Sequence, residues 1–196
     1  NTHLSKAGTP TMGGILIIGS TVISTLLWSK LTVHYIWLVL FITVGYGVIG
    51  FLDDYSKLKK KSSKGIPGTV RLAGEIGLAL IVGIILYVKP GFNSAVTIPF
   101  FKTILPDLGR GYILFSVFII VGAANAVNLT DGLDGLAIGP ATICFATYLL
   151  FAYFSGNVKI SGYLQIPYVA GSGELAVFCG AMVGSGIGFL WYNTYP

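Results

Sequence analysis

Charged side chains are scarce in this sequence. Of its 196 residues, 10% are charged and 54% are hydrophobic, whereas an ordinary soluble domain carries about 25% charged residues. So few charges could not cover the surface of a soluble protein of this size, and disordered chains combine low hydrophobicity with high net charge. Both classes are therefore excluded, and the composition predicts a polytopic membrane protein. The 27 glycines are typical of helices that pack closely in lipid.

Common metal-binding and nucleotide-binding motifs are missing. The two cysteines, Cys144 and Cys179, each lie within an apolar run without a CxxC spacing, so we interpret them as small buried hydrophobic residues. The sequence lacks a GxxxxGK(S/T) loop, which excludes a nucleotide-hydrolysing motor of that type. The net charge of +5 indicates basic loops beside an anionic leaflet, and we expect no nucleic-acid partner.

Six apolar runs approach the length of about 20 residues that a helix needs to cross a bilayer. They cover residues 11–27, 34–52, 71–88, 111–127, 136–154 and 174–192. The prediction is an all-α, polytopic integral membrane bundle that forms one transmembrane domain over residues 1–196. Because the chain begins at Asn1 without Met and stops just after an apolar run, we expect an internal piece of a longer protein.

Basic residues are concentrated in one loop. The segment after the second run reads KLKKKSSK at residues 57–64. Under the positive-inside rule this loop is cytoplasmic, and so are both ends of the chain and the loop at residues 128–135. The opposite loop at residues 89–110 contains a β-prone stretch between Pro and Gly, which predicts a short β-hairpin on the outer face.

Acidic residues are few and unevenly distributed. Only seven are present, although a charge at the centre of a membrane helix costs about 2.5–3.5 kcal/mol and less near the interface. Their gathering on one side therefore indicates a functional site there. Glu75 also allows a structural pairing with Arg71, four residues before it. The acids at predicted cytoplasmic ends of the runs are Asp53, Asp54, Glu75, Asp131 and Asp134.

The first acidic group is the pair Asp53-Asp54, followed by Lys57. Adjacent carboxylates on a helix point about 100° apart, so one can face a ligand while the other orients a neighbour or a metal. Two carboxylates this close repel each other, and one then holds its proton more tightly. Such a pair suits a general base or a Mg²⁺ site, since Mg²⁺ takes one or two carboxylates plus phosphate oxygens. The alternative is a solvated helix end.

The second group is the segment NAVNLTDGLDGL at residues 125–136. Asn128, Asp131 and Asp134 repeat every three residues and would share one face of a helical turn. The two glycines let the backbone leave the helix and approach a ligand closely. The segment could read the base and ribose of a nucleotide or hold a metal, and a capped turn between helices is the alternative.

Three further polar residues lie next to the first and last runs. Lys6 is a mobile cation suited to a phosphate, and Thr11 lies near a helix start, where free N–H groups favour anions. Asn193 follows Trp and Tyr residues that are typical of interface anchors. Helix capping and interface anchoring are the alternatives. Because all these groups lie on one predicted side, the sequence indicates phosphoryl chemistry at the cytoplasmic interface.

Four motifs resemble those of the phospho-N-acetylmuramoyl-pentapeptide transferases, the MraY branch of the polyprenyl-phosphate N-acetylhexosamine-1-phosphate transferase family. They occur in the family's order and extend over the whole chain. The TPTMGG form favours this branch over those that use UDP-N-acetylglucosamine. The motifs are KAGTPTMGG at residues 6–14, FLDDYSK at 51–57, NAVNLTDGLDGLA at 125–137 and GFLWYNTYP at 188–196.

The resemblance implies an enzyme that transfers phospho-MurNAc-pentapeptide from UDP-MurNAc-pentapeptide to undecaprenyl phosphate. The products would be UMP and lipid I, the first membrane intermediate of peptidoglycan synthesis, with Mg²⁺ as cofactor. It also implies a bacterial inner-membrane bundle of about ten helices, its active site facing the cytoplasm, a homodimer, and nucleoside antibiotics as inhibitors. The alternative within the family is a UDP-N-acetylglucosamine:undecaprenyl-phosphate GlcNAc-1-phosphate transferase. A transporter or a scaffold would not explain acids clustered at one interface.

The resemblance also implies roles for individual residues. Asp53 and Asp54 match the acidic pair that supplies a base for the lipid phosphate and ligands for Mg²⁺. The family's main Mg²⁺ ligand, in a Met-Gly-Asp segment, and its His-rich loop have no match within these 196 residues, so we do not expect this piece to be active alone. The matching substrate-binding positions are Lys6, Thr11, Lys57, Asn128, Asp131, Gly132, Leu133, Asp134 and Asn193.

Overall fold

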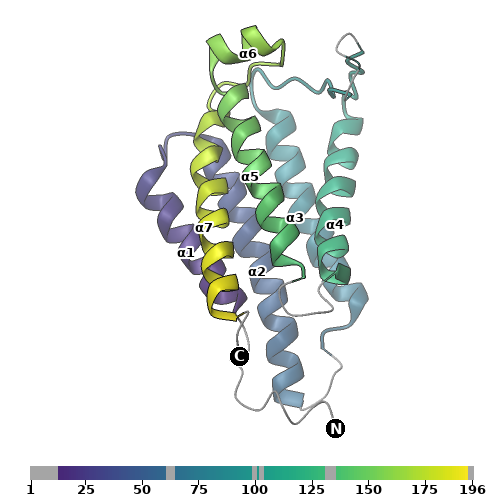
Figure 1. Ribbon diagram of the computed structural model, residues 1–196. Coiled ribbons are helices and arrows are strands. Elements are labelled where there is room, and N and C mark those ends of the chain that lie inside the picture. Colours follow the sequence, from purple (N-terminus) through teal and green to yellow (C-terminus); the bar gives the residue numbers. More distant parts are fainter. Residues whose placement is uncertain (1–12, 61–64, 99–100, 102–103, 131–135, 194–196) are drawn as a thin grey trace. The chain divides into compact units, whose positions relative to one another are not determined.

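The computed structural model describes residues 13–60, 65–98, 101, 104–130 and 136–193, without the side chains of Lys60 and Asn193. Figure 1 shows that helices run through almost all of this part of the chain. In chain order the elements are α1 (Gly14–Trp28), α2 (His34–Lys60), α3 (Gly68–Val88), α4 (Gly111–Thr130), α5 (Ile138–Ser155), α6 (Val158–Leu164), the short 3-10 helix η2 (Ser172–Glu174) and α7 (Leu175–Asn193).

The long helices confirm the predicted fold class. Five segments are long and apolar enough to cross a membrane, namely α2, α3, α4, α5 and η2 with α7. The sixth apolar helix, α1, has 15 residues, fewer than the roughly 20 needed for a perpendicular crossing. Each of the six predicted runs thus corresponds to one apolar helix, and the chain is an all-α, multi-pass membrane protein.

Two helices extend beyond the apolar runs that predicted them. The α2 helix continues past residue 52 to Lys60, and α4 continues past residue 127 to Thr130. Apolar composition marks where lipid ends, but backbone hydrogen bonds between residues four apart continue into water or headgroups. The acidic pair therefore lies within the helical part of α2.

The sequence did not predict the short helix α6. Asn157 caps α6, because its side-chain oxygen accepts hydrogen bonds from the N–H groups of Lys159 and Ile160. Gln165 ends the helix in the left-handed conformation, with a φ of 55°. Seven residues are too few to establish a hydrophobic period over the usual window.

The predicted β-hairpin is reduced to a single bridge, and the part of the chain that the structure describes contains no strand. One antiparallel bridge joins Ala95 to Asp107, beside a hydrogen bond from the Val96 N–H to the Pro106 carbonyl. Pro106 has no N–H with which to continue a ladder. The Ser94 hydroxyl and the Gly109 N–H instead donate to the Asp107 carboxylate and hold its pKa below the ordinary value.

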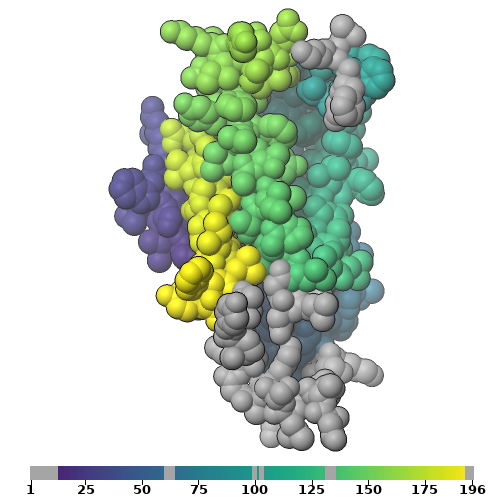
Figure 2. Space-filling view, viewed as in Figure 1, coloured from purple at the N-terminus to yellow at the C-terminus, as the bar shows by residue number. Residues whose placement is uncertain are grey.

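The chain folds as two compact units, which are described separately. The first comprises residues 1–47 and 129–196. Within it α7 packs against both α1 and α5, and Figures 1 and 2 show these three helices side by side with α6 at one end of α5. Its core joins Ile36 and Leu40 of α2 to Phe178 and Cys179 of α7.

The two cysteines differ in their surroundings. Cys179 is buried, as predicted, whereas Cys144 is exposed on α5, so its predicted burial is wrong. An apolar run in a membrane helix has both protein-facing and lipid-facing sides, and the sequence of the run does not distinguish them.

The second unit comprises residues 48–128, which include the second half of α2 and the helices α3 and α4. Ala79 and Val82 of α3 are buried. Gly83 lies so close to α4 that a Cβ atom there would lie 2.6 Å from the Ser116 hydroxyl oxygen. This close approach brings the polar side chains of α3 and α4 within hydrogen-bonding reach. The prediction of one transmembrane domain over the whole chain stays a prediction.

Candidate active site

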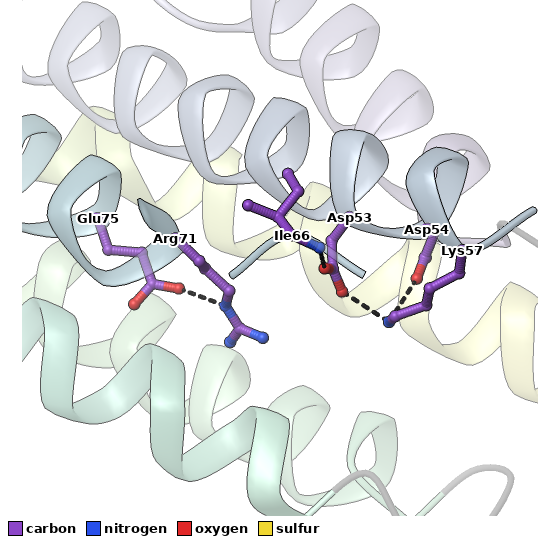
Figure 3. Close-up of polar contacts among 6 residues, drawn as sticks. All are labelled: Asp53, Asp54, Lys57, Ile66, Arg71 and Glu75. Atoms are coloured by element: carbon purple, nitrogen blue, oxygen red, sulfur yellow. Dashed lines mark hydrogen bonds and ion pairs between the residues drawn. The ribbon is translucent and has the colours of Figure 1, made fainter. Parts of the chain in front are cut away.

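Lys57 joins the two acidic residues near the end of α2. Its Nζ atom lies 2.6 Å from Asp53 Oδ2 and 3.2 Å from Asp54 Oδ1. Figure 3 shows Lys57 directed toward both carboxylates. Spacings of four and three residues place all three side chains on neighbouring positions of the helix surface. One ammonium group therefore offsets the repulsion between the adjacent carboxylates.

The two carboxylates have different surroundings. Asp53 Oδ1 accepts a hydrogen bond of 2.7 Å from the Ile66 N–H, so both of its oxygens are engaged and the side chain is 13% exposed. The Asp54 side chain is 54% exposed. Gly65 permits this arrangement, since a Cβ atom there would collide with the Asp53 carboxylate. Asp53 thus fixes the chain that enters α3, while Asp54 is open to a ligand.

A second polar cluster joins α3 to α4. Arg71 Nε donates to Glu75 Oε1 at 2.8 Å, which confirms the pairing expected from their spacing. The Asn125 amide donates to Glu75 Oε2 at 2.6 Å and to the Val121 carbonyl at 2.9 Å. Glu75 is only 2% exposed. Its two carboxylate oxygens accept hydrogen bonds from both helices, one from Arg71 of α3 and one from Asn125 of α4.

Asn128 continues this cluster toward the end of α4. The pairing of donors and acceptors places its amide oxygen against Arg71, at 3.0 Å from Nη1 and 2.9 Å from Nη2. Arg71 thus uses Nε for Glu75 and both Nη atoms for Asn128. A planar guanidinium can make these contacts together because its donors lie in one fixed fork.

The structure places four of the predicted site residues. Asp53, Asp54 and Lys57 lie together on α2, and Asn128 lies on the last turn of α4. Asn193 ends α7, and its side chain is outside the described part. The other predicted positions lie outside the described residues: Lys6, Thr11, Asp131, Gly132, Leu133 and Asp134.

Sequence reasoning missed the contact of Asn125 with Glu75, that of Arg71 with Asn128 and that of the Ile66 N–H with Asp53. Asn125 lies in the NAVNLTDGLDGL motif, but nothing in the neighbouring sequence indicates its contact with Glu75, which lies 50 residues away. The Ile66 N–H that donates to Asp53 is a backbone group, so no residue type in the sequence indicates this contact. Both contacts depend on how helices pack, which a periodic apolar pattern does not specify.

The donor set allows part of a magnesium site. Among the described residues, no group of three or more His, Cys, Asp or Glu side chains could hold a metal ion. Mg²⁺ usually takes one or two carboxylates and fills its other positions with water or substrate phosphates. The Asp53-Asp54 pair fits that requirement, with Asp54 the more accessible carboxylate.

Apolar membrane-length helices and a charged cluster at their ends define a multi-pass membrane protein with a polar site beside the lipid. The sequence model for glycosyl transferase family 4 matches residues 36–196, and the chain belongs to this family. Signature 1 of the phospho-N-acetylmuramoyl-pentapeptide-transferases matches residues 6–18.

Several curated proteins named phospho-N-acetylmuramoyl-pentapeptide-transferase are similar to this chain. The protein from Syntrophus aciditrophicus is 72% identical over 194 residues, and those from Citrifermentans bemidjiense and Pelobacter propionicus are 60% and 59% identical over the same length. Each match covers 99% of this chain and 54% of the relative. The chain thus spans about half the length of the curated relatives it matches.

Proposed function

We propose that the whole protein transfers phospho-MurNAc-pentapeptide from UDP-MurNAc-pentapeptide to undecaprenyl phosphate and releases UMP. The observation that carries the proposal is the Asp53-Asp54 pair, held by Lys57 at the end of a membrane helix in a glycosyl transferase of family 4. The names of the relatives and the matched signature favour the pentapeptide substrate over UDP-N-acetylglucosamine. The product would be lipid I.

In the mechanism we favour, the lipid phosphate attacks directly. One carboxylate of the Asp53-Asp54 pair accepts a proton from undecaprenyl phosphate. A lipid phosphate oxygen then bonds to the β-phosphorus of the UDP-sugar, and the bond from that phosphorus to the bridging oxygen breaks as UMP leaves. Bound Mg²⁺ would neutralise the pyrophosphate and stabilise the leaving group. Lys57 pairs with both carboxylates and offsets the repulsion between them.

The alternative mechanism has two steps. One Asp attacks the β-phosphorus and forms a phospho-sugar enzyme intermediate, which the lipid phosphate then resolves. We favour direct attack because the lipid phosphate is already an anionic nucleophile. Trapping of a covalent sugar phosphate on either Asp, followed by mass spectrometry of the peptide, would contradict this preference.

The proposed site faces the cytoplasm. The basic residues between positions 57 and 64 support this orientation under the positive-inside rule. The UDP-linked substrate would then approach from the aqueous side, while the lipid phosphate approaches along the membrane surface.

The experiment uses the full-length protein in detergent with Mg²⁺ and undecaprenyl phosphate, and it follows UMP release with each of two UDP-sugars. Release with UDP-MurNAc-pentapeptide alone would support the proposal. Release with UDP-N-acetylglucosamine alone would contradict the substrate and retain the reaction type. No release with either substrate from well-folded protein would contradict the enzymatic proposal.

A further inference from the structure

Glu75 is a buried carboxylate that the mechanism above does not use. It lies on α3 with 2% of its surface exposed, in a helix that is apolar enough to cross a membrane. Burying a charge there is costly unless it is paired and hydrogen-bonded. Its place in the sequence therefore needs a reason beyond packing.

We infer that Glu75 is a positioning residue, which orients Asn128 for the uridine nucleotide by fixing the guanidinium of Arg71. The inference deepens the proposed function and rests on it. Glu75 itself contacts no reacting atom. It acts through Arg71, which it holds, and through Asn128, which Arg71 holds in turn.

The first link is the anchoring of Glu75 to α4. Its Oε2 atom accepts from the Asn125 amide at 2.6 Å, and the same amide nitrogen donates to the Val121 carbonyl at 2.9 Å. Asn125 is thus held by the backbone of its own helix. Glu75 is thereby fixed relative to α4 and not only to α3.

The second link is the fixed orientation of Arg71. Its Nε atom donates to Glu75 Oε1 at 2.8 Å, and Figure 3 shows its Nη atoms directed away from Glu75. Because the guanidinium is planar, one bond at Nε determines the direction of both Nη donors. Those donors hold the Asn128 amide oxygen at 3.0 and 2.9 Å.

The third link is the place of Asn128 in the chain. It lies on the last turn of α4, which ends at Thr130, directly before the segment whose resemblance implies nucleoside binding. With its oxygen held by both Nη atoms of Arg71, the plane and direction of the Asn128 amide are fixed. A fixed amide at this point is suited to hydrogen-bonding with a uridine nucleotide, which presents carbonyl and hydroxyl groups.

Glu75 also limits the directions that the Arg71 guanidinium can take. Without the bond from Nε to Glu75 Oε1, the guanidinium could rotate away from Asn128. Loss of Glu75 is therefore expected to weaken nucleotide binding while the lipid phosphate still binds.

The test compares variants of the full-length enzyme in detergent by steady-state kinetics. Glu75→Leu removes both acceptors, and we expect the KM for UDP-MurNAc-pentapeptide to rise about tenfold, as for a lost hydrogen bond to a charged group. The KM for undecaprenyl phosphate should stay unchanged. Glu75→Gln keeps the length and one carbonyl acceptor, and it should return the KM to within about threefold of wild type.

Two further variants separate positioning from stability. Asn125→Ala removes the α4 anchor with a small deletion and leaves the Arg71–Glu75 pair, so a smaller rise in the same KM is expected even if Glu75→Leu folds poorly. Glu174→Leu is the matched control, since Glu174 accepts the Lys30 N–H at 2.8 Å in the other unit and should leave both KM values unchanged.

The outcomes are distinct. A selective rise in the KM for the UDP-sugar supports the inference. The inference would be overturned if both KM values stayed unchanged in Glu75→Leu and Asn125→Ala. It would also be overturned if both KM values rose equally together with a lowered melting temperature. In either case, activity of the wild type would still uphold the proposed function. Absence of UMP release by the wild type would overturn the proposed function and this inference with it.

Discussion

Asp53 and Asp54 are neighbours in sequence but differ in the contacts they make. Asp53 accepts from the Ile66 N–H and pairs with Lys57, and little of it is exposed. Asp54 shares Lys57 but is largely exposed. At the scale of residues, substitutions of the two should therefore have different effects on stability, although both belong to the proposed site.

The change Asp54→Asn should lower the rate of UMP release by about 10²-fold or more, the usual contribution of a general base or its equivalent. Its melting temperature should stay close to that of the wild type, because an exposed ion pair such as that of Asp54 with Lys57 contributes less than about 1 kcal/mol. The change Asp53→Asn should lower both activity and melting temperature. UMP release and thermal unfolding in detergent measure the two effects.

Asp107→Asn is the control for the acidic pair. Asp107 is an exposed carboxylate that accepts from Ser94 and Gly109 in the loop between α3 and α4. Its substitution should leave UMP release unchanged. Full activity in Asp54→Asn, or an equal loss in Asp107→Asn, would contradict the role assigned to the acidic pair.

The sequence predicted contacts within a helix better than contacts between helices. The spacing of Arg71 and Glu75 predicted their ion pair correctly. At the scale of elements, however, the bond from Asn125 to Glu75 joins residues 50 positions apart. It exists only because α3 and α4 pack at a particular register, which apolar runs do not encode.

Short elements were the other failure of sequence reasoning. The seven-residue helix α6 depends on one capping side chain, Asn157, and the predicted hairpin is limited to a bridge beside Pro106. In both places single residues determine the backbone, whereas the six apolar helices follow from long stretches of composition. The adjacency of the acidic pair is visible in the sequence, but the hydrogen bond from the Ile66 N–H to Asp53 is not.

The close approach of α3 to α4 gives a prediction for packing. Gly83→Ala should lower stability by about 1–3 kcal/mol, since the added Cβ would press on the Ser116 hydroxyl. Gly77→Ala is the control on the same helix, where a Cβ meets no atom within 4 Å, and it should be neutral or stabilising by up to about 1 kcal/mol. Thermal unfolding in detergent measures both. Equal melting temperatures for the two variants would contradict the close contact.

At the scale of the whole molecule, the proposal requires the acidic pair to face the cytoplasm. In a background with Cys144 and Cys179 replaced by Ala, a cysteine at Lys59 should react with a membrane-impermeant maleimide only when the cytoplasmic side is accessible. A cysteine at Lys159, next to the cap of α6, should react from the opposite side. Labelling of both positions from one side would contradict the assigned orientation.

Family membership rests on most of the chain, whereas the proposed activity concerns a whole protein about twice as long. The family match covers residues 36–196, and the relatives extend over roughly the same length again. The dimer, the inhibitors and Mg²⁺ stay predictions. The described residues supply the acidic pair and the Glu75–Arg71–Asn128 connection, and the transfer reaction is proposed for the complete protein.

The most direct measurement is the transfer itself. Full-length protein is incubated with undecaprenyl phosphate and UDP-MurNAc-pentapeptide that carries a label in its peptide, and the label extracted with the lipid is compared with the UMP released. The account predicts equal amounts of both products with Mg²⁺ present, and neither once EDTA has removed the metal. UMP release without labelled lipid, or no transfer from well-folded protein, would contradict the central claim.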